Sequence, residues 1–176
     1  MKASKVYWLV LSALFAALTI VLGYVSIPVG PVPITLQTFA VVLTALLLPH
    51  PFSSLAMSVH LLIKIFQGAN PLTTPSFGFL IGFIVTALVI GLYLESHPLE
   101  TLTAKEALVL FLIALFLPYT VGLPYMIVLL TNVLHVPGSI GLWIYKGMLI
   151  FLPFDCVKLA LALILAKRVK PLLKSK

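Results

Sequence analysis

The chain contains several apolar runs of about twenty residues that carry almost no charge. Only 9% of the residues are charged while 62% are hydrophobic, far fewer charges than the surface of a water-soluble domain of 176 residues needs. The runs are therefore predicted to lie in a lipid bilayer, where each segment must satisfy its own backbone polar groups. Their length and lack of alternation favour transmembrane helices over the strands of a barrel.

Six membrane-spanning helices are predicted, separated by segments rich in proline, glycine or charge. They cover residues 6–27, 36–48, 52–66, 76–94 and 104–130, followed by a sixth helix that ends at residue 167. The start of the sixth helix stays open, because Pro153 suits the first turn of a helix and residues 143–152 could form a separate, angled piece. The whole chain, residues 1–176, is predicted to be a single all-α membrane domain.

The first apolar run follows two lysines, a pattern that also begins secretory signal peptides. The run is longer than the apolar core of a typical signal peptide, and more spans come after it. It is therefore interpreted as the first transmembrane helix.

Lysine and arginine gather on one side of the predicted membrane domain. Lys2 and Lys5 precede the first helix, Lys105 lies between the fourth and the fifth, and further cations follow the sixth. The positive-inside rule makes this side cytoplasmic, so both termini are predicted to be cytoplasmic. The loops predicted to face outward hold no lysine or arginine, and they are residues 28–35, 67–75 and 131–141. The net charge of +7 is attributed to a tail beside anionic lipid rather than to nucleic-acid binding.

Four charged side chains fall inside the predicted spans or at their outer ends: Lys64, Lys146, Asp155 and Lys158. A charge at the bilayer centre costs about 2.5 to 3.5 kcal/mol on insertion scales, so it usually faces the bundle interior and has a partner. Asp155 and Lys158 are three residues apart, hence on one helix face, and are predicted to lie in the outer half of the bilayer. The pair is interpreted either as a structural lock between helices or as the floor of a site for a ligand that enters from outside.

Polar residues in the loop at residues 67–75 leave two interpretations open. Asn70 precedes a proline and could simply form a turn, or it could join Gln67 in binding a ligand. His60 is interpreted as a packed or hydrogen-bonded histidine.

The sequence shows no cluster of cysteine, histidine and carboxylate for a metal, no cofactor-binding motif and no nucleophile with a nearby base, so an enzyme is not expected.

Small residues four positions apart mark two helices as sites of close packing. Ala13 and Ala17 have this spacing on the first predicted helix, and Gly78 and Gly82 have it on the fourth. Small side chains let helix backbones approach closely in lipid, within the bundle or against a partner.

Three stretches together resemble the BioY family, the biotin-binding S components of energy-coupling factor (ECF) transporters. They are GPVPITLQTFAVVLTALLL from residue 30, NPLTTPSFGFLIGF from residue 70 and LPFDCVKLALA from residue 152. The resemblance implies a compact six-helix S-component bundle in a prokaryotic plasma membrane, with biotin entering from outside. It also implies a separate coupling membrane subunit and ATPase subunits that use ATP. The chain itself lacks the phosphate-binding loop of an ATPase.

The resemblance also suggests roles for particular residues. Substrate binding is expected of Asp155, Lys158, Asn70, Gln37, Thr35, Gln67 and Lys64. Contact with the coupling subunit is expected of Ala13 and Ala17. Phe77 and Phe79 stand where the family has glycine and tyrosine, and the only arginine, Arg168, lies in the predicted cytoplasmic tail. The biotin carboxylate is therefore expected to meet a lysine, either Lys158, Lys64 or Lys146.

Two other functions remain open at this point. An S component for another vitamin, such as thiamine or riboflavin, would share the same fold. A solute channel would share the apolar composition, but it would conduct its solute without a partner.

Overall fold

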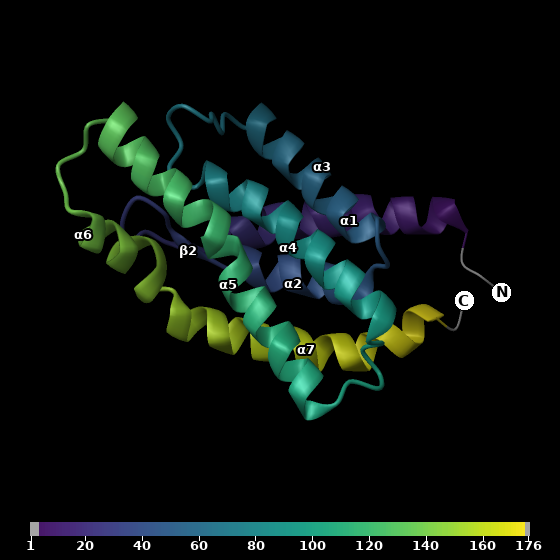
Figure 1. Ribbon diagram of the computed structural model, residues 1–176. Helices are drawn as coiled ribbons and strands as arrows, with labels where there is room; N and C mark the ends of the chain where they lie inside the picture. The colour runs from purple at the N-terminus through teal and green to yellow at the C-terminus, as the bar shows by residue number, and fades with distance from the viewer. Residues whose placement is uncertain (1–3, 175–176) are drawn as a thin grey trace.

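The computed structural model describes residues 4–174, and its apolar helices pack side by side along one direction (Figure 1). The principal helices are α1 (Lys5–Tyr24), α2 (Gln37–Leu47), α3 (Phe52–Phe66), α4 (Phe77–Ser96), α5 (Ala104–Val128) and α7 (Leu152–Lys174). Four segments of the described chain are long and apolar enough to cross a membrane, and α2 and α3 are shorter apolar helices. The prediction of six transmembrane helices in an all-α bundle is confirmed.

The first predicted helix is three residues too long. α1 ends at Tyr24, and the chain then forms a short antiparallel hairpin of β1 (Ser26–Ile27) and β2 (Ile34–Thr35). Ser26 pairs with Thr35, so the proline-rich segment between the strands is the turn of a hairpin. Proline disfavours helical backbone in the residue before it, which explains why the helix stops ahead of Pro28 although the residues there are apolar.

The prediction for the sixth helix is partly right. A separate piece does precede it, formed by α6 (Ile140–Ile144) and a following π-helical turn, η2 (Tyr145–Leu149), so it starts earlier than the predicted residue 143. Pro153 lies in the first turn of α7, as expected. The predicted end at residue 167 is wrong, since α7 continues to Lys174. Basic residues are favourable in the last turns of a helix, so the cations after residue 166 do not end it. The fifth helix is similarly extended by η1 (Leu129–Val133).

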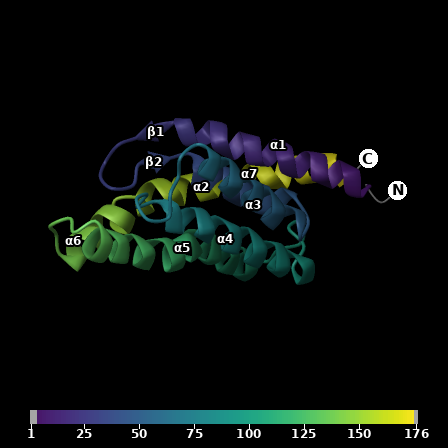
Figure 2. The same cartoon turned by 90° about the horizontal axis from the view of Figure 1, so that it is seen from above.

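The short helix α2 is the centre of the bundle. Its residues from Ala40 to Leu47 are all buried, and it contacts α1, α3, α4 and α7. Eleven residues span only about 16 Å, roughly half of the hydrocarbon core. Figure 2 shows α1 on one side of the bundle and α5 on the opposite side, with α2 between them. α2 begins beside the last turn of α1, because a Cβ added to Gly23 would lie 2.6 Å from the Gln37 amide nitrogen, and the β1–β2 hairpin joins these two helix ends.

Helices α4 and α5 approach closely through a small residue. An added Cβ on Gly82 would lie 2.8 Å from the backbone oxygen of Pro118, closer than side-chain carbons normally come. The close packing predicted from the Gly78 and Gly82 spacing is thus present, within the bundle.

The connections separate into two ends of the bundle, as an even number of spans predicts. α1 begins and α7 ends at the same end, where the α2–α3 and α4–α5 connections also lie (Figure 1). The hairpin, the α3–α4 loop and the α5–α6 loop lie at the other end. Lys2 and Lys176 fall outside the described residues. The assignment of the first end to the cytoplasm stays a prediction.

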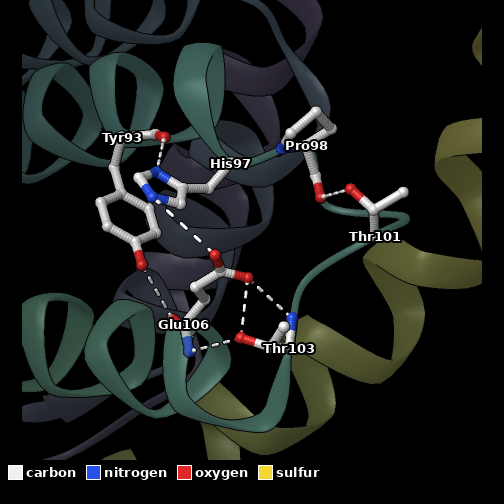
Figure 3. A network of polar contacts seen from close by, with 6 residues as sticks. All are labelled: Tyr93, His97, Pro98, Thr101, Thr103 and Glu106. Atoms are coloured by element: carbon white, nitrogen blue, oxygen red, sulfur yellow. Dashed lines mark hydrogen bonds and ion pairs between the residues drawn. The ribbon is translucent and has the colours of Figure 1, made fainter.

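A network of polar contacts closes the α4–α5 connection (Figure 3). The Thr103 hydroxyl accepts the backbone N–H of Glu106, and the Glu106 carboxylate accepts the backbone N–H of Thr103, which caps the start of α5. The His97 ring stacks on Tyr93 and lies 3.9 Å from the Glu106 carboxylate. The contacts join the end of α4 to the beginning of α5.

Candidate functional site

A cavity of about 140 Å³ lies at the hairpin end of the bundle, over the start of α2. Its apolar wall is formed by Val32, Phe79, Leu80, Phe83 and Phe151. Its polar wall is formed by Thr35, Gln37, Thr38, Lys64, Tyr119, Asp155 and Lys158. A concave space in which polar side chains converge beside an aromatic and aliphatic wall is typical of a small-molecule site.

The Asp155 carboxylate lies at the floor of this cavity and is almost completely buried, with 3% of the residue exposed. One oxygen accepts hydrogen bonds from the Lys158 ammonium at 2.6 Å and from the Thr38 hydroxyl at 3.2 Å. The other oxygen accepts the hydroxyl hydrogen of Tyr119. Asp155 also lies in the first turn of α7, where the helix dipole stabilises negative charge. These hydrogen bonds and the helix dipole together offset the free-energy cost of burying the Asp155 charge.

Lys158 is also buried, and its ammonium group bridges two elements. It donates to Asp155 and, at 2.8 Å, to the backbone oxygen of Thr35 in the hairpin. A lysine ammonium has three N–H groups, so one donor remains after these two bonds. The prediction that Asp155 and Lys158 share one face of the last helix and pair there is confirmed by the 2.6 Å ion pair.

Gln37 and Thr35 form a second polar group beside the pair. The Thr35 hydroxyl accepts the backbone N–H of Gln37 at 3.2 Å and donates to the Gln37 side-chain oxygen at 3.4 Å. The Gln37 amide nitrogen lies 3.2 Å from Nε2 of His60, which is buried on α3. His60 therefore is hydrogen-bonded, as expected, and it stands behind a residue of the cavity wall.

The other predicted residues divide between the cavity and its surroundings. Lys64 lines the cavity and is half-buried. Asn70 and Gln67 are exposed and are absent from the cavity wall. The Asn70 side chain accepts the backbone N–H of Leu72 at 2.7 Å, which stabilises the turn, and Gln67 donates to the hydroxyl of Tyr24 at 3.3 Å. These two side chains hold loops in place, and their predicted role in substrate binding stays a prediction.

Three further predicted residues lie away from the cavity. Lys146 is half-buried and outside the wall, and its carbon chain passes beside Gly30 in the hairpin. Ala13 and Ala17 are exposed on α1, on a face that no other helix covers in the described residues. An exposed pair of small residues is available to a partner helix.

Tyr119 is the main residue that the sequence analysis missed. It lies inside a long apolar helix, where a tyrosine is easily taken for a packing residue. A signal was present, because a buried tyrosine hydroxyl usually needs a partner, and the Asp155 carboxylate in another span can accept more than one hydrogen bond. Which helix would bring the two together could not be deduced without the packing.

Comparison with known proteins decides the family. A profile of the BioY family matches residues 1–175. The chain belongs to the BioY family. The Thermotoga maritima protein named biotin transporter BioY is 34% identical over 177 positions, which cover 93% of this chain and 96% of that relative. A Lysinibacillus sphaericus protein named probable biotin transporter BioY is 35% identical over 147 positions, covering 79% of this chain and 74% of the relative.

A solved structure supports the fold of this BioY family member. It is described as the S-component for biotin from an ECF-type ABC transporter, and it superposes with a TM-score of 0.79 at 25% identity. The match covers 97% of this chain and 94% of that structure. The expected S-component bundle is therefore confirmed, and the chain is a multi-pass membrane protein of a transporter family rather than an enzyme.

The buried ion pair leads to a prediction about stability. Asp155→Asn or Lys158→Met leaves one charge buried without its partner, which we expect to cost about 3 to 5 kcal/mol of unfolding free energy. The double variant carries no buried charge, so it should recover most of that loss. Thermal unfolding of the four purified proteins in detergent measures this coupling. A double variant whose loss equals the sum of the two single losses would show that the groups do not stabilise each other.

Proposed function

We propose that this chain is the biotin-binding membrane subunit of a high-affinity uptake system and takes biotin from the outer side. The proposal is supported by its relatives, which are named biotin transporters, and by the S-component fold. The observation that carries it is a cavity with an apolar wall on one side and, on the other, a buried carboxylate and ammonium with hydrogen-bonding capacity to spare.

The polar head of biotin matches that capacity. A ureido group offers two N–H donors and one carbonyl oxygen. The Asp155 carboxylate has room for further donors, since two carboxylate oxygens provide about four lone-pair sites and three are engaged. The remaining N–H of Lys158 can donate to an oxygen of the ligand. Burial strengthens these hydrogen bonds because water does not compete for them.

The rest of biotin is apolar until its carboxylate. Its thiophane ring and valeryl chain suit the wall formed by Phe79, Phe83 and Phe151. We assign the carboxylate to Lys64, since this ammonium lines the cavity and no carboxylate of the described residues pairs with it. Lys158 is already neutralised by Asp155, and Lys146 lies outside the wall.

The hairpin over the cavity supports tight binding. Prolines fix the backbone angles of its turn, at positions 28, 31 and 33, so less order is lost when it closes on a ligand. Lys158 ties the hairpin to α7 through the oxygen of Thr35.

Uphill uptake requires partners that this chain does not supply by itself. We propose that a coupling membrane subunit and ATPase subunits in a prokaryotic plasma membrane complete the transporter, as the description of the solved S-component suggests. Exposure of Ala13 and Ala17 on α1 makes this helix face the proposed contact with the coupling subunit.

Direct binding tests the proposed substrate. Purified protein in detergent should bind radiolabelled biotin saturably, and excess thiamine or riboflavin should not displace it. Lys64→Met should weaken the binding of biotin but not the binding of biotin methyl ester, because the ester lacks the carboxylate. The matched control is Lys105→Met, which removes a cation at the opposite end of the bundle. Absence of saturable biotin binding, or displacement of the labelled biotin by thiamine or riboflavin, would contradict the assignment. Passive biotin flux through the protein alone in liposomes would favour a channel.

A bulky residue on α1 tests the proposed partner contact. Ala13→Trp or Ala17→Trp would hold a facing helix away, so we expect ATP-driven uptake to be lost while biotin binding is retained. Leu18→Trp is a control of equal bulk at an exposed position of the same helix, turned away from the face that carries Ala13 and Ala17. Normal uptake by both alanine variants would place the contact elsewhere.

A further inference from the structure

The side-chain amide of Gln37 is held in one orientation by its neighbours. Its oxygen accepts the Thr35 hydroxyl hydrogen at 3.4 Å, so the amide nitrogen is directed away from Thr35. That nitrogen lies 3.2 Å from Nε2 of His60. An amide NH₂ group can only donate, and therefore His60 Nε2 is the acceptor. The second N–H of the amide has no partner among the described residues, and Gln37 lines the cavity.

This arrangement determines the tautomer of His60. If Nε2 accepts a hydrogen bond in the neutral ring, the proton must be on Nδ1. Nδ1 is buried and has no hydrogen-bond partner in the part of the chain that the structure describes. Burying an unpaired polar group is unfavourable, so an apolar side chain would be the simpler way to fill this position. Packing alone does not explain a histidine here, whereas orientation of Gln37 does.

A glycine on another helix supports the same amide. A Cβ added to Gly23 on α1 would lie 2.6 Å from the Gln37 amide nitrogen and 2.9 Å from its carbonyl carbon. The amide therefore occupies space that only glycine leaves open. Three elements thus converge on one side chain: Gly23 on α1, Thr35 on β2 and His60 on α3.

We infer that His60 and Gly23 are positioning residues that fix the Gln37 amide so that one N–H points to the ligand's ureido oxygen. The assignment to this oxygen rests on the proposed function. Thr38, the next residue along α2, donates to Asp155, and Asp155 is the proposed acceptor for the ureido N–H groups. Gln37 is therefore beside the ureido end of the ligand, and its orientation selects a ligand that has an acceptor there.

Three ligands separate this role from simple packing. Biotin and biotin methyl ester have the ureido oxygen, while 2-iminobiotin has a nitrogen group in its place. His60→Leu should lower the affinity for biotin and for its ester about tenfold each, which corresponds to the loss of one hydrogen bond. The affinity for 2-iminobiotin should be unchanged. His60→Gln should keep the selectivity of the parent, because a glutamine oxygen can accept where Nε2 did. An equal loss for all three ligands in His60→Leu, no loss at all, or loss of selectivity in His60→Gln would overturn the inference.

The glycine and a double variant give independent controls. Gly23→Ala should also lower selectivity for the ureido oxygen, because its Cβ must displace the amide. Gly141→Ala is the matched control, since an added Cβ there meets no atom closer than 3.9 Å. In a Gln37→Leu background, His60→Leu should cause no further loss of biotin affinity. A further tenfold loss would show that His60 acts other than through Gln37, which contradicts the inference.

A ligand-free measurement tests the geometry by itself. Histidine imidazole ¹⁵N signals report which ring nitrogen carries the proton, and the signal missing in His60→Leu identifies His60. We expect protonated Nδ1 and unprotonated, hydrogen-bonded Nε2, with the Nε2 signal shifting in Gln37→Leu. A proton on Nε2, or no shift, would overturn the inference. If the parent binds none of the three ligands, the proposed function fails, and these signals alone decide whether His60 orients Gln37.

Discussion

The buried ion pair of Asp155 and Lys158 is the interaction on which the hairpin end of the bundle depends. Each charge would be unfavourable in an apolar protein, and each is acceptable here because the two are 2.6 Å apart and further hydrogen bonds satisfy them. Those further bonds come from three different elements, with Thr38 on α2, Tyr119 on α5 and the backbone of Thr35 on β2. The same contacts that make the charges tolerable therefore hold α7, α5, α2 and the hairpin together around the cavity.

The cavity lies where the start of α2 meets the ends of longer helices. α2 begins beside the last turn of α1, because a Cβ added to Gly23 would lie 2.6 Å from the Gln37 amide nitrogen, and Thr38 donates to Asp155 in the first turn of α7. The first residues of α2, including Gln37 and Thr38, therefore face the cavity. The hairpin borders the same cavity at Thr35, and Lys158 ties it to α7 through the backbone oxygen of that residue.

Much of this architecture could be predicted from sequence, because apolar length and cation placement are local features. The i, i+3 spacing of Asp155 and Lys158 also fixed their pairing in advance, and α3 was predicted with its observed bounds. The roles of side chains on separate helices could not be predicted in this way. Tyr119 resembled an ordinary aromatic residue until packing brought it to Asp155. The contact of the Asn70 oxygen with the backbone N–H of Leu72 was likewise visible only in the structure, and its predicted role in binding stays a prediction. Periodicity gives the face of a helix, but long-range packing decides which faces meet.

The central claim is that biotin enters this cavity from the outer side of the membrane. The most direct measurement is labelling of Ser76→Cys, a cavity-lining position at the start of α4, with an impermeant thiol reagent on intact cells. Cys156→Ala removes the native thiol, and Ser139→Cys in the exposed α5–α6 loop and Ser4→Cys before α1 serve as controls. The account predicts that Ser76→Cys is labelled from outside and that biotin protects it, while Ser139→Cys is labelled with or without biotin and Ser4→Cys is not labelled. Labelling of Ser76→Cys that saturating biotin leaves unchanged would contradict the claim.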